Sequence, residues 1–545
     1  YTYKLMPRGG FRGFLVSCLV VCALWGGVCA AGFAATGGNN DGEMGLGDFD
    51  ERYSLTSLPL SAFGGEAPID VCNGEQHTVV LTEEGHLYSM GADWHGQLGV
   101  AGDCQPKQNV PLLIDPAYFG GNKISSIACG YQHTIVIDQT HTVYGFGDNC
   151  DGQLGTKAVW QLSDSPIPVQ FDKIAMQGHP IKAAAYGYTT YVLTSEGEVW
   201  AFGLNMDCEA GQPGSESGNY MPVQLPTLMD LSVGGSPSGP VMDVVAGYDF
   251  VVFLMASGDV LAMGANTYGQ LGVGSTYTQT DKAQKVLPFW GSLTPVSLSV
   301  GNIHTLAHMD DGSVYCWGSN TYSQCTTKDV PHVTSPIRMN LSAVEGGKVS
   351  LVAAGDDMTM VADAASTLYT SGTTMFGSSG IGHYPWTVES VYMTPIDSSA
   401  LYAEDASATT TLRTGSNWWD TNFVMAVDTH THVFTDKSGT IDSAFYTEGT
   451  SNRWIIAPSA ESVSLVCDGI SPAGSTLRLY SGVYQPLDGS VSDPTLLGVA
   501  GGVIAMDTVQ TLSEAQDGTP CLFLDFDTLL ANGAGQEFTC TYSTL

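Results

Sequence analysis

The chain has 545 residues, 66 of them glycine, and carries 18 Lys and Arg against 54 Asp and Glu, for a net charge of −36. Nucleic-acid binders need a basic surface to displace counterions from phosphate, so this charge argues against that class of protein. An acidic surface instead favours solubility, cation binding or a basic protein partner.

The N-terminal segment has the form of a targeting sequence. Arg8 and Arg12 precede an apolar run over residues 14–25, and Val28-Cys29-Ala30 gives the small-x-Ala pattern of a cleavage site. This pattern predicts a signal peptide over residues 1–30. We therefore expect a secreted or cell-surface protein with no membrane span after cleavage.

The alternative for this segment is an uncleaved anchor, because the apolar stretch of residues 14–35 is just long enough to cross a bilayer. Cleavage would remove three of the 13 cysteines and leave an even number, as expected of a disulfide-bearing secreted protein. Residues 31–50 are rich in Gly, Asn and Asp and predict a flexible linker.

A repeated pattern dominates the chain from residue 51. One copy begins with Gly74-Glu-Gln-His77-Thr78 and ends with Gly96-Gln-Leu-Gly99. Closely similar motifs begin 56 residues later, at Gly130 and Gly152. A fixed period of this length is typical of repeat architectures. Further copies open at Gly187, Gly247, Gly301 and Gly355, and a degenerate seventh copy covers residues 422–434.

Each copy combines apolar alternating runs with polar Gly turns, the pattern of short strands joined in hairpins. Four strands of about six residues fit into one copy. A single small sheet cannot bury its own faces, whereas seven arranged around an axis can. The sequence therefore predicts an all-β fold, with a seven-bladed β-propeller over residues 51–458. Residues 51–70 are expected to add a strand that helps close the ring, and residues 454–457 to return as its partner.

These motifs resemble the repeat of the regulator of chromosome condensation family. His-Thr is kept at His77, His133 and His304, and Gly-Gln-Leu-Gly ends at Gly99, Gly155 and Gly272. The resemblance covers residues 51–458 and implies the propeller. Fold alone does not carry function, since the family includes a nuclear GTPase exchange factor and secreted propellers that bind other proteins.

Residues 459–545 contain no copy of the repeat and predict a separate small β-sandwich. The segments 477–482 and 535–542 resemble the CUB family, which often holds calcium. No ligand positions match, so we expect no cofactor, with calcium as an untested option. Strands are predicted at residues 462–466, 476–481, 495–499, 521–526 and 537–542.

Aromatic residues recur in the turn before Gly-Gln-Leu-Gly, and if they project from one rim they would anchor a protein partner. The alternative is that they pack between blades. The tandem Trp pair lies in an insertion and is hard to bury, which favours partner contact. The predicted partner-binding residues are Trp94, His95, Tyr268, Tyr322, Phe376, Trp418 and Trp419.

Several cysteines fall at positions that suggest disulfides, although connectivity stays open. Cys316 and Cys325 flank one hairpin end, and Cys72 and Cys129 lie one repeat apart on equivalent inner strands. The further candidates are Cys104 with Cys150 or Cys208, and Cys521 with Cys540, which leaves Cys467 without an obvious partner. Asn340 opens the one glycosylation sequon.

The repeat histidines His77, His133 and His304 occupy one position in different blades and predict structural hydrogen bonds rather than acid–base chemistry. No in-phase acid pair, nucleophile–base pair, phosphate-binding Gly loop or Cys-x-x-Cys motif is evident, and His430 and His432 have no evident third metal ligand, so the chain is predicted to hold no metal and not to be an enzyme. The leading hypothesis is a secreted or cell-surface binding or scaffold protein that acts in adhesion or in assembly, with other proteins or with copies of itself as partners. The alternative is an inhibitor or regulator of another extracellular protein.

Overall fold

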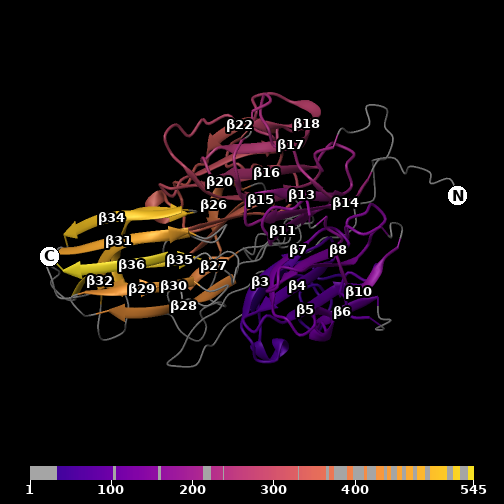
Figure 1. The fold of residues 1–545 in the computed structure, drawn as a ribbon, viewed down its shortest axis with the longest axis horizontal. Coiled ribbons are helices and arrows are strands. Elements are labelled where there is room, and N and C mark those ends of the chain that lie inside the picture. The colour runs from indigo at the N-terminus through magenta and orange to yellow at the C-terminus, as the bar shows by residue number, and fades with distance from the viewer. Residues whose placement is uncertain are drawn as a thin grey trace.

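The computed structural model describes residues 33–373 with short gaps, and beyond residue 390 it describes strands by their backbone path and pairing. The gaps lie at residues 102–105, 158–160, 173, 213–221, 237, 329 and 364–366. Between residues 374 and 545, the segments outside the strands and Ile396 are not described. Figure 1 shows the propeller in indigo to salmon on one side and the C-terminal strands in orange and yellow on the other.

Six four-stranded antiparallel sheets form the propeller in the described part of the chain, and each uses four consecutive strands. The first three blades are β3 (Pro68–Asn73), β4 (His77–Thr82), β5 (Leu87–Ala92), β6 (Lys107–Leu113); β7 (Ile124–Cys129), β8 (His133–Asp138), β9 (Val143–Gly147), β10 (Ser163–Pro168); and β11 (Pro180–Tyr186), β12 (Thr189–Thr194), β13 (Val199–Gly203), β14 (Val223–Leu228). The next three are β15 (Val241–Gly247), β16 (Phe250–Met255), β17 (Val260–Asn266), β18 (Tyr277–Lys285); β19 (Pro295–Val300), β20 (His304–Met309), β21 (Val314–Ser319), β22 (His332–Arg338); and β23 (Leu351–Ala354), β24 (Met358–Ala362), β25 (Leu368–Gly372), β26 (Ser390–Pro395). Single 3-10 turns, η1 (Leu60–Phe63), η2 (Pro116–Phe119) and η3 (Glu345–Gly347), lie in connections between blades.

The second strand of each blade is buried along its whole length, because both faces of a blade pack against its neighbours. The run Phe-Val-Val-Phe-Leu-Met of β16 is one example. Trp317 and Phe202 are fully buried between blades. The outermost strands are more exposed and carry Pro111 and Lys107 on β6, residues that discourage pairing with another chain's edge.

A two-stranded sheet precedes the first blade and corrects the expected linker. β1 (Phe33–Gly37) pairs with β2 (Arg52–Leu58), and the loop between them buries Asn39 and Met44 completely. The β2 strand agrees with the strand expected within residues 51–70. Residues 33–45 are therefore part of the folded propeller rather than a flexible linker, because their apolar side chains pack against Val80 and Tyr88 of the first blade.

The sheet β1–β2 has the register of the outer half of a blade. Ala35 pairs with Thr56 as Ala201 pairs with Thr227 in the third blade, and Gly37 ends β1 with φ of 117°. The equivalent glycines Gly91, Gly147, Gly203, Gly264, Gly318 and Gly372 have φ between 102° and 109°, a range that strongly favours glycine.

The expected seventh repeat does not form a seventh four-stranded sheet among the described strands. Its residues lie in β28 (Met425–Phe434), which pairs with β27 (Thr410–Arg413) on one side and in parallel with β30 (Ser451–Ile456) on the other. The N-terminal strand of the first blade, β3, lies against β28. Residues 454–457 were expected to return to the propeller, but β30 instead pairs with β35 (Thr519–Asp527) of the C-terminal sheet.

Two sheets make up the C-terminal region, with strand orders β27-β28-β30-β35-β32-β33 and β29-β36-β31-β34. Their remaining strands are β29 (Ser438–Asp442), β31 (Ser462–Ile470), β32 (Thr476–Tyr484), β33 (Val491–Gly501), β34 (Val503–Thr511) and β36 (Phe538–Thr544). All five predicted strands are present, and β34 was missed. The sequence predicted that the C-terminal domain begins at residue 459. In the structure, the two C-terminal sheets also include β27 to β30, which all precede that residue.

The candidate disulfide between Cys521 and Cys540 does not fit the strand register. Cys521 lies on β35 opposite Gly482, in the six-stranded sheet. Cys540 lies on β36 in the other sheet, directly opposite Cys467 on β31. Cys467, for which the sequence suggested no disulfide partner, therefore lies opposite Cys540. The order of hydrogen-bonded strands, and not the order along the chain, decides which residues face each other.

Candidate functional site on the turn face

The site is built from the turns that join the first and second strands of each blade. Every such turn begins at a glycine and brings the next one or two residues to the same end of the propeller, which we call the turn face. A side chain at Gly74 or Gly130 would collide with the imidazole of His77 or His133, since an added Cβ would lie 2.0 Å from it. The residues that follow these glycines are Glu75, Tyr131, Tyr188, Tyr248, Asn302 and Asp356.

Backbone hydrogen bonds connect these turns from blade to blade. Glu75 N–H donates to the Tyr131 carbonyl at 2.8 Å, and Tyr131 N–H donates to the Gly187 carbonyl at 2.7 Å. Tyr248 N–H donates to Asn302, and Asn302 N–H to Asp356, at 2.8 and 3.3 Å. These bonds connect the first three turns with one another and the last three with one another, so the propeller itself holds the backbone of this face in position.

The buried repeat histidines also connect neighbouring blades beneath the turn face. The Nε2 of His77 lies 2.9 Å from Thr134 Oγ1 of the next blade, and His133 makes the same contact with Thr190. Burial lowers the pKa of His77 and His133 to about 3, so both are neutral near pH 7. His304 lies 3.3 Å from Thr359 Oγ1 in the same way. These contacts agree with the structural role expected for the histidines.

Loops that follow the third strands surround the turns and repeat one set of hydrogen bonds. In residues 149–155, Asn149 Oδ1 accepts from Leu154 N–H at 3.0 Å and Gln153 Oε1 accepts from Asp151 N–H at 2.8 Å. The Gln153 carbonyl then accepts from Thr190 Oγ1 of the next blade at 2.9 Å. The equivalent loops cover residues 39–45, 93–99, 205–211, 266–272 and 320–326; we call them repeat loops.

Tyrosines gather at the centre of the turn face. Tyr131 lies at the middle of the cluster, with ring centroids 5.1 Å from Tyr188 in an edge-to-face contact and 6.0 Å from Tyr248 in a stacked one. Tyr186 lies 6.3 Å away. Such pairs stabilise by about 0.5–1.5 kcal/mol beyond area burial. Tyr131 and Tyr186 are buried, whereas Tyr188 and Tyr248 are half-buried. The cluster is therefore anchored on one side and accessible on the other.

Acidic groups lie close to these rings. Burial raises the pKa of Tyr131 well above its usual value, and the neighbouring Tyr186, Tyr248, Asp356 and Glu75 raise it further. Burial also raises the pKa of Asp357 to about 6. The face thus combines aromatic surface with carboxylates in a place where solvent screens them less than at the open surface.

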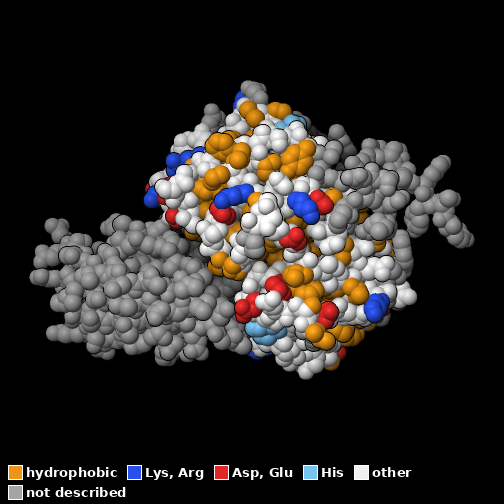
Figure 2. Space-filling model, turned by 45° about the horizontal axis from the view of Figure 1, so that its top comes forward, with side chains coloured by type: hydrophobic (Ala, Val, Ile, Leu, Met, Phe, Trp, Pro, Cys, Tyr) orange, Lys and Arg blue, Asp and Glu red, His pale blue; other side chains and the backbone are white. Residues whose placement is uncertain are grey.

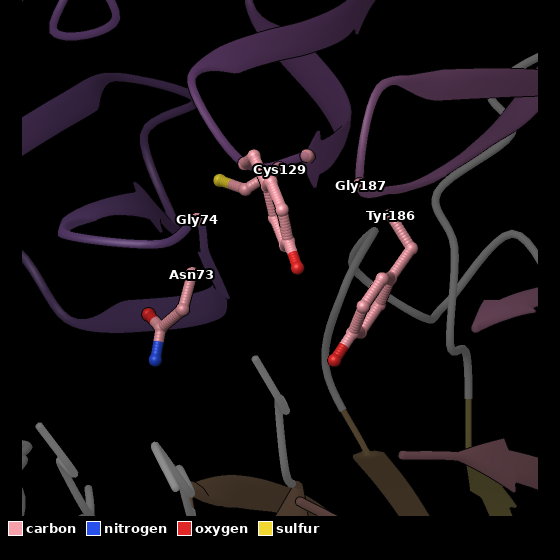
Figure 3. A pocket seen from close by; sticks show the side chains of 7 residues that line it. Asn73, Gly74, Cys129, Tyr186 and Gly187 are labelled. Atoms are coloured by element: carbon pink, nitrogen blue, oxygen red, sulfur yellow. The ribbon is translucent and has the colours of Figure 1, made fainter. Parts of the chain in front are cut away.

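A small pocket opens beside the cluster (Figure 3). It is lined by Asn73, Gly74, Cys129, Gly130, Tyr131, Tyr186 and Gly187. Asn73 is 3% exposed, and neither its Oδ1 nor its Nδ2 makes a hydrogen bond among the described residues. Buried polar atoms are normally paired, so this amide is an exception that needs an explanation.

Comparison with known proteins places this architecture. Residues 32–417 match the family described as the RCC1-like domain, and this match begins at the residue before β1. The chain belongs to the RCC1-like domain family. The family expected from the repeat motifs is confirmed, and with it an all-β propeller.

Relatives of the RCC1-like domain share parts of the chain. A stretch of 241 residues is 32% identical to the ultraviolet-B receptor UVR8 of Arabidopsis thaliana, covering 44% of this chain and 50% of that protein. Another of 330 residues is 28% identical to human E3 ubiquitin-protein ligase HERC2, covering 60% of this chain and 6% of that protein. The chain thus spans half or less of the length of these relatives.

Solved structures support the RCC1-like fold. Yeast RCC1 (Prp20), in its complex with Kap60, matches with a TM-score of 0.58 and 18% identity over 77% of this chain and 94% of that chain. Human WBSCR16 matches with a TM-score of 0.58 and 18% identity over 70% of this chain and 96% of that chain. At this identity the likeness shows the fold alone.

The rim residues predicted from the sequence lie in the repeat loops of the RCC1-like propeller. Trp94 is 48% exposed, with Lys107 Nζ 5.5 Å from its ring centroid, and Tyr268 is 38% exposed. His95 and Tyr322 are half-buried. Phe376, Trp418 and Trp419 lie outside the described residues. Figure 2 shows one face of the molecule, where hydrophobic side chains form several patches and acidic and basic side chains are scattered among them.

Two candidate disulfides are present in the RCC1-like propeller. Cys72 and Cys129 join β3 to β7 across two blades, and Cys316 and Cys325 join β21 to its repeat loop. Cys150 and Cys208 lie in repeat loops, and burial together with Asp148 raises the pKa of Cys150 to about 12. Cys104 lies outside the described residues, so the pairing of these three stays a prediction.

The remaining sequence predictions meet the following findings. Asn340 is exposed in the connection after β22, where a glycan would have room. In the described part of the chain, no group of three or more His, Cys, Asp or Glu side chains is placed to hold a metal ion. No described helix is long and apolar enough to cross a membrane.

The sequence analysis did not predict the tyrosine cluster. A signal was present, because Tyr131, Tyr188 and Tyr248 each directly follow the glycine that opens a repeat.

Proposed function

We propose that this chain is a non-enzymatic protein-binding propeller that uses its turn face to hold a protein partner outside the cell or at its surface. The observation that carries the proposal is the partly accessible cluster of Tyr131, Tyr188 and Tyr248 beside the pocket that Asn73 lines. Aromatic residues at the centre of a fixed surface are the usual anchors of protein interfaces.

The disulfide between two blades supports the extracellular location in this proposal. Cys72 and Cys129 are 57 residues apart and hold two blades together next to the turn face. Disulfides persist in oxidising compartments and are rare in the cytosol. Together with the apolar N-terminal segment, this pair favours secretion or display at the cell surface.

Relatives support protein binding as the general activity. The structure of yeast RCC1 was solved bound to Kap60, and a study of Prp20p from Saccharomyces cerevisiae concerns its binding to Gsp1p and histones. These partners belong to those proteins. What transfers to this chain, as a proposal, is the use of a rigid propeller as a protein-binding platform.

We also infer that the ring closes through a seventh blade, with β27 and β28 as its inner strands and β1 and β2 as its outer ones. The register of β1–β2, its repeat loop and the contact of β28 with β3 support this closure. The C-terminal sheets would then form the expected CUB-like sandwich beside the closing blade and supply a second contact. Deleting residues 33–58 should abolish cooperative unfolding of the propeller; an unchanged transition would contradict this closure.

Cross-linking of the protein in its native setting, followed by mass spectrometry, tests the proposed function. We expect cross-links from residues of the turn face to a partner, and their loss when Tyr188 is replaced by Ala. Tyr118→Ala is the matched control, because Tyr118 is exposed on η2, in a connection between blades. A partner held equally by both variants would contradict the proposal.

The identity of the cross-linked proteins also distinguishes a role in assembly or adhesion from a role as a regulator or inhibitor. Links between copies of the chain indicate assembly or adhesion, and links to one unlike protein at equal stoichiometry indicate a regulator or inhibitor.

A further inference from the structure

We propose that a pair of histidines, His141 and His179, makes the contact between the second and third blades sensitive to acid. Near neutral pH the two imidazoles connect these blades, and at acidic pH they separate. The pair lies at the end of β8 that is remote from the turn face, so this property is independent of the proposed partner binding.

His141 lies in the turn between the second and third strands of its blade, at a position that favours glycine. In the other copies that the structure describes, the residue two places before the third strand is Gly85, Gly197, Gly258 or Gly312. These glycines have φ between 76° and 80°, and His141 has φ of 64°. A side chain is unfavourable in this left-handed region, so its presence points to a contact that the imidazole makes.

A backbone hydrogen bond that connects other pairs of neighbouring blades cannot form at this turn. Ile124 N–H donates to the Gly85 carbonyl, and Val241 N–H donates to the Gly197 carbonyl, each at 3.0 Å. The strand register places Pro180 at the equivalent point of the third blade, and proline has no N–H. The contact between the second and third blades at this point therefore depends on side chains.

The imidazole of His141 makes that contact. Its Nδ1 lies 3.2 Å from the Pro180 carbonyl oxygen, and its ring centroid lies 3.7 Å from that of His179, with 40° between the ring planes. The Nδ1 of His179 lies 3.4 Å from Ser195 Oγ. Because a carbonyl oxygen can only accept, Nδ1 of His141 carries a hydrogen, and Nε2 is the atom that takes up a further proton. Both rings are half-buried.

Protonation of both rings changes the energy of this contact. One proton is compatible with stacking, since a cation is attracted to an aromatic face. A second proton places two like charges on rings whose centroids are 3.7 Å apart, and these charges repel each other. Burial lowers the pKa of His179 from 6.5, and the neighbouring His141 lowers it further. The contact therefore contributes fully to stability above about pH 6.5, and this contribution is lost as the pH falls through the lower pKa of the folded state.

Four charged side chains lie on the segments around the pair: Lys123, Asp138, Glu196 and Glu198. Lys123 pairs with an exposed carboxylate, Asp138 accepts from N–H groups of its own turn, and Glu198 accepts from a Trp N–H. Glu196 favours the protonated form of His179 electrostatically. It is exposed, so solvent screens this attraction, and the pKa of His179 stays lowered.

Hydrogen–deuterium exchange of the intact protein at pH 7.5 and pH 5, corrected for the intrinsic exchange rate, tests the proposal. The reporters are the N–H groups of His141 and Ser195, which donate to the Asp138 and His179 carbonyls. We expect their protection to fall at least about tenfold at pH 5, the change in an equilibrium constant that one pKa unit produces. Protection of Val241 N–H, at the contact of the third and fourth blades, should stay the same and thus exclude general unfolding.

Two variants and one matched control assign the effect to the pair. His141→Gly introduces the residue of the other copies and is compatible with the local fold, and His179→Gln keeps a polar side chain without a titrating ring. In both variants, protection of the Ser195 N–H should no longer depend on pH. His86→Gln removes a half-buried histidine of the first blade, paired with Glu66, and should keep the acid response of the wild type.

Three results would overturn the proposal. They are equal protection of the wild type at both pH values, an acid response that persists in His141→Gly, and an equal loss of protection at Val241. The last result would mean that acid loosens the whole propeller rather than this one contact between blades.

Discussion

Glu43 occupies in its repeat loop the place that Gln153 occupies in another. Glu43 Oε2 accepts from Asp41 N–H at 2.7 Å, and Gln153 Oε1 accepts from Asp151 N–H at 2.8 Å. Gln153 also donates to Asp148 Oδ2 at 3.0 Å, which an ionised carboxylate in its place could not do. An acid thus stands where the loop is built for a neutral amide.

This substitution predicts a pH-dependent stability. Burial raises the pKa of Glu43 from 4.5 to about 8, so folding favours its protonated form. Its contribution to stability is present below about pH 4.5 and is lost as the pH rises towards 8, at up to about 1.4 kcal/mol per pH unit. Glu43→Gln should therefore raise the free energy of unfolding at pH 8 much more than at pH 5, measured by urea denaturation. Gln153→Glu, the reverse change, should lower it at pH 8.

The buried histidines predict the opposite dependence. Burial lowers the pKa of His77 to about 3, below its unfolded value of 6.5. Its contribution is complete above pH 6.5 and is lost as the pH falls towards 3. His77→Gln should flatten the fall in stability between pH 6.5 and 5, measured by chemical denaturation at several pH values. A slope unchanged from the wild type would show that His77 is protonated in the folded state.

The contact between His77 and Thr134 also predicts a coupling between blades. Thr134→Val removes the hydroxyl 2.9 Å from His77 Nε2 and leaves a buried polar atom unpaired. The cost should be about 1–3 kcal/mol of unfolding free energy. Thr140→Val, at an exposed turn position, is the control and should cost less. Equal effects of the two changes would argue against the interblade bond as a source of stability.

The ion pair of Lys182 and Asp243 links β11 to β15, with the lysine half-buried and the carboxylate buried. Lys182→Met leaves the carboxylate of Asp243 buried without its partner and should cost about 3–5 kcal/mol. Lys123→Met breaks the exposed pair with Glu84 and should cost less than about 1 kcal/mol. Thermal unfolding of both variants measures the difference. Similar melting temperatures would mean that water screens the Lys182 pair as well.

The register of the C-terminal strands predicts a disulfide between Cys467 and Cys540. Residues directly opposite in an antiparallel pair have Cα atoms about 4.5–5.5 Å apart, within the range of disulfides. Non-reducing peptide mapping should recover these two cysteines in one linked peptide. Recovery of Cys540 linked to Cys521 would contradict the strand register.

The sequence by itself determined the blades and the family, because a Gly turn, a hairpin and an apolar run are local signals that recur with one period. It also contained one signal that the prediction missed: Gly42-Glu-Met-Gly45 lies 54 residues before Gly96-Gln-Leu-Gly99, within the spacing of the other copies. Glu43 and Met44 replace the Gln and Leu of the motif, so this copy was not recognised as a buried repeat loop. The Gly- and Asn-rich composition of the segment then suggested a linker.

Only the tertiary structure decided which distant residues meet. Tyr131, Tyr188 and Tyr248 are 57 and 60 residues apart in the chain, and radial packing of three blades brings their rings to within 5–6 Å of Tyr131. The pairing of β28 with β30, and of Cys467 with Cys540, likewise depends on contacts between strands far apart in sequence. A period specifies how each blade is built, whereas the set of side chains that meet on the turn face follows from long-range packing that no local pattern records.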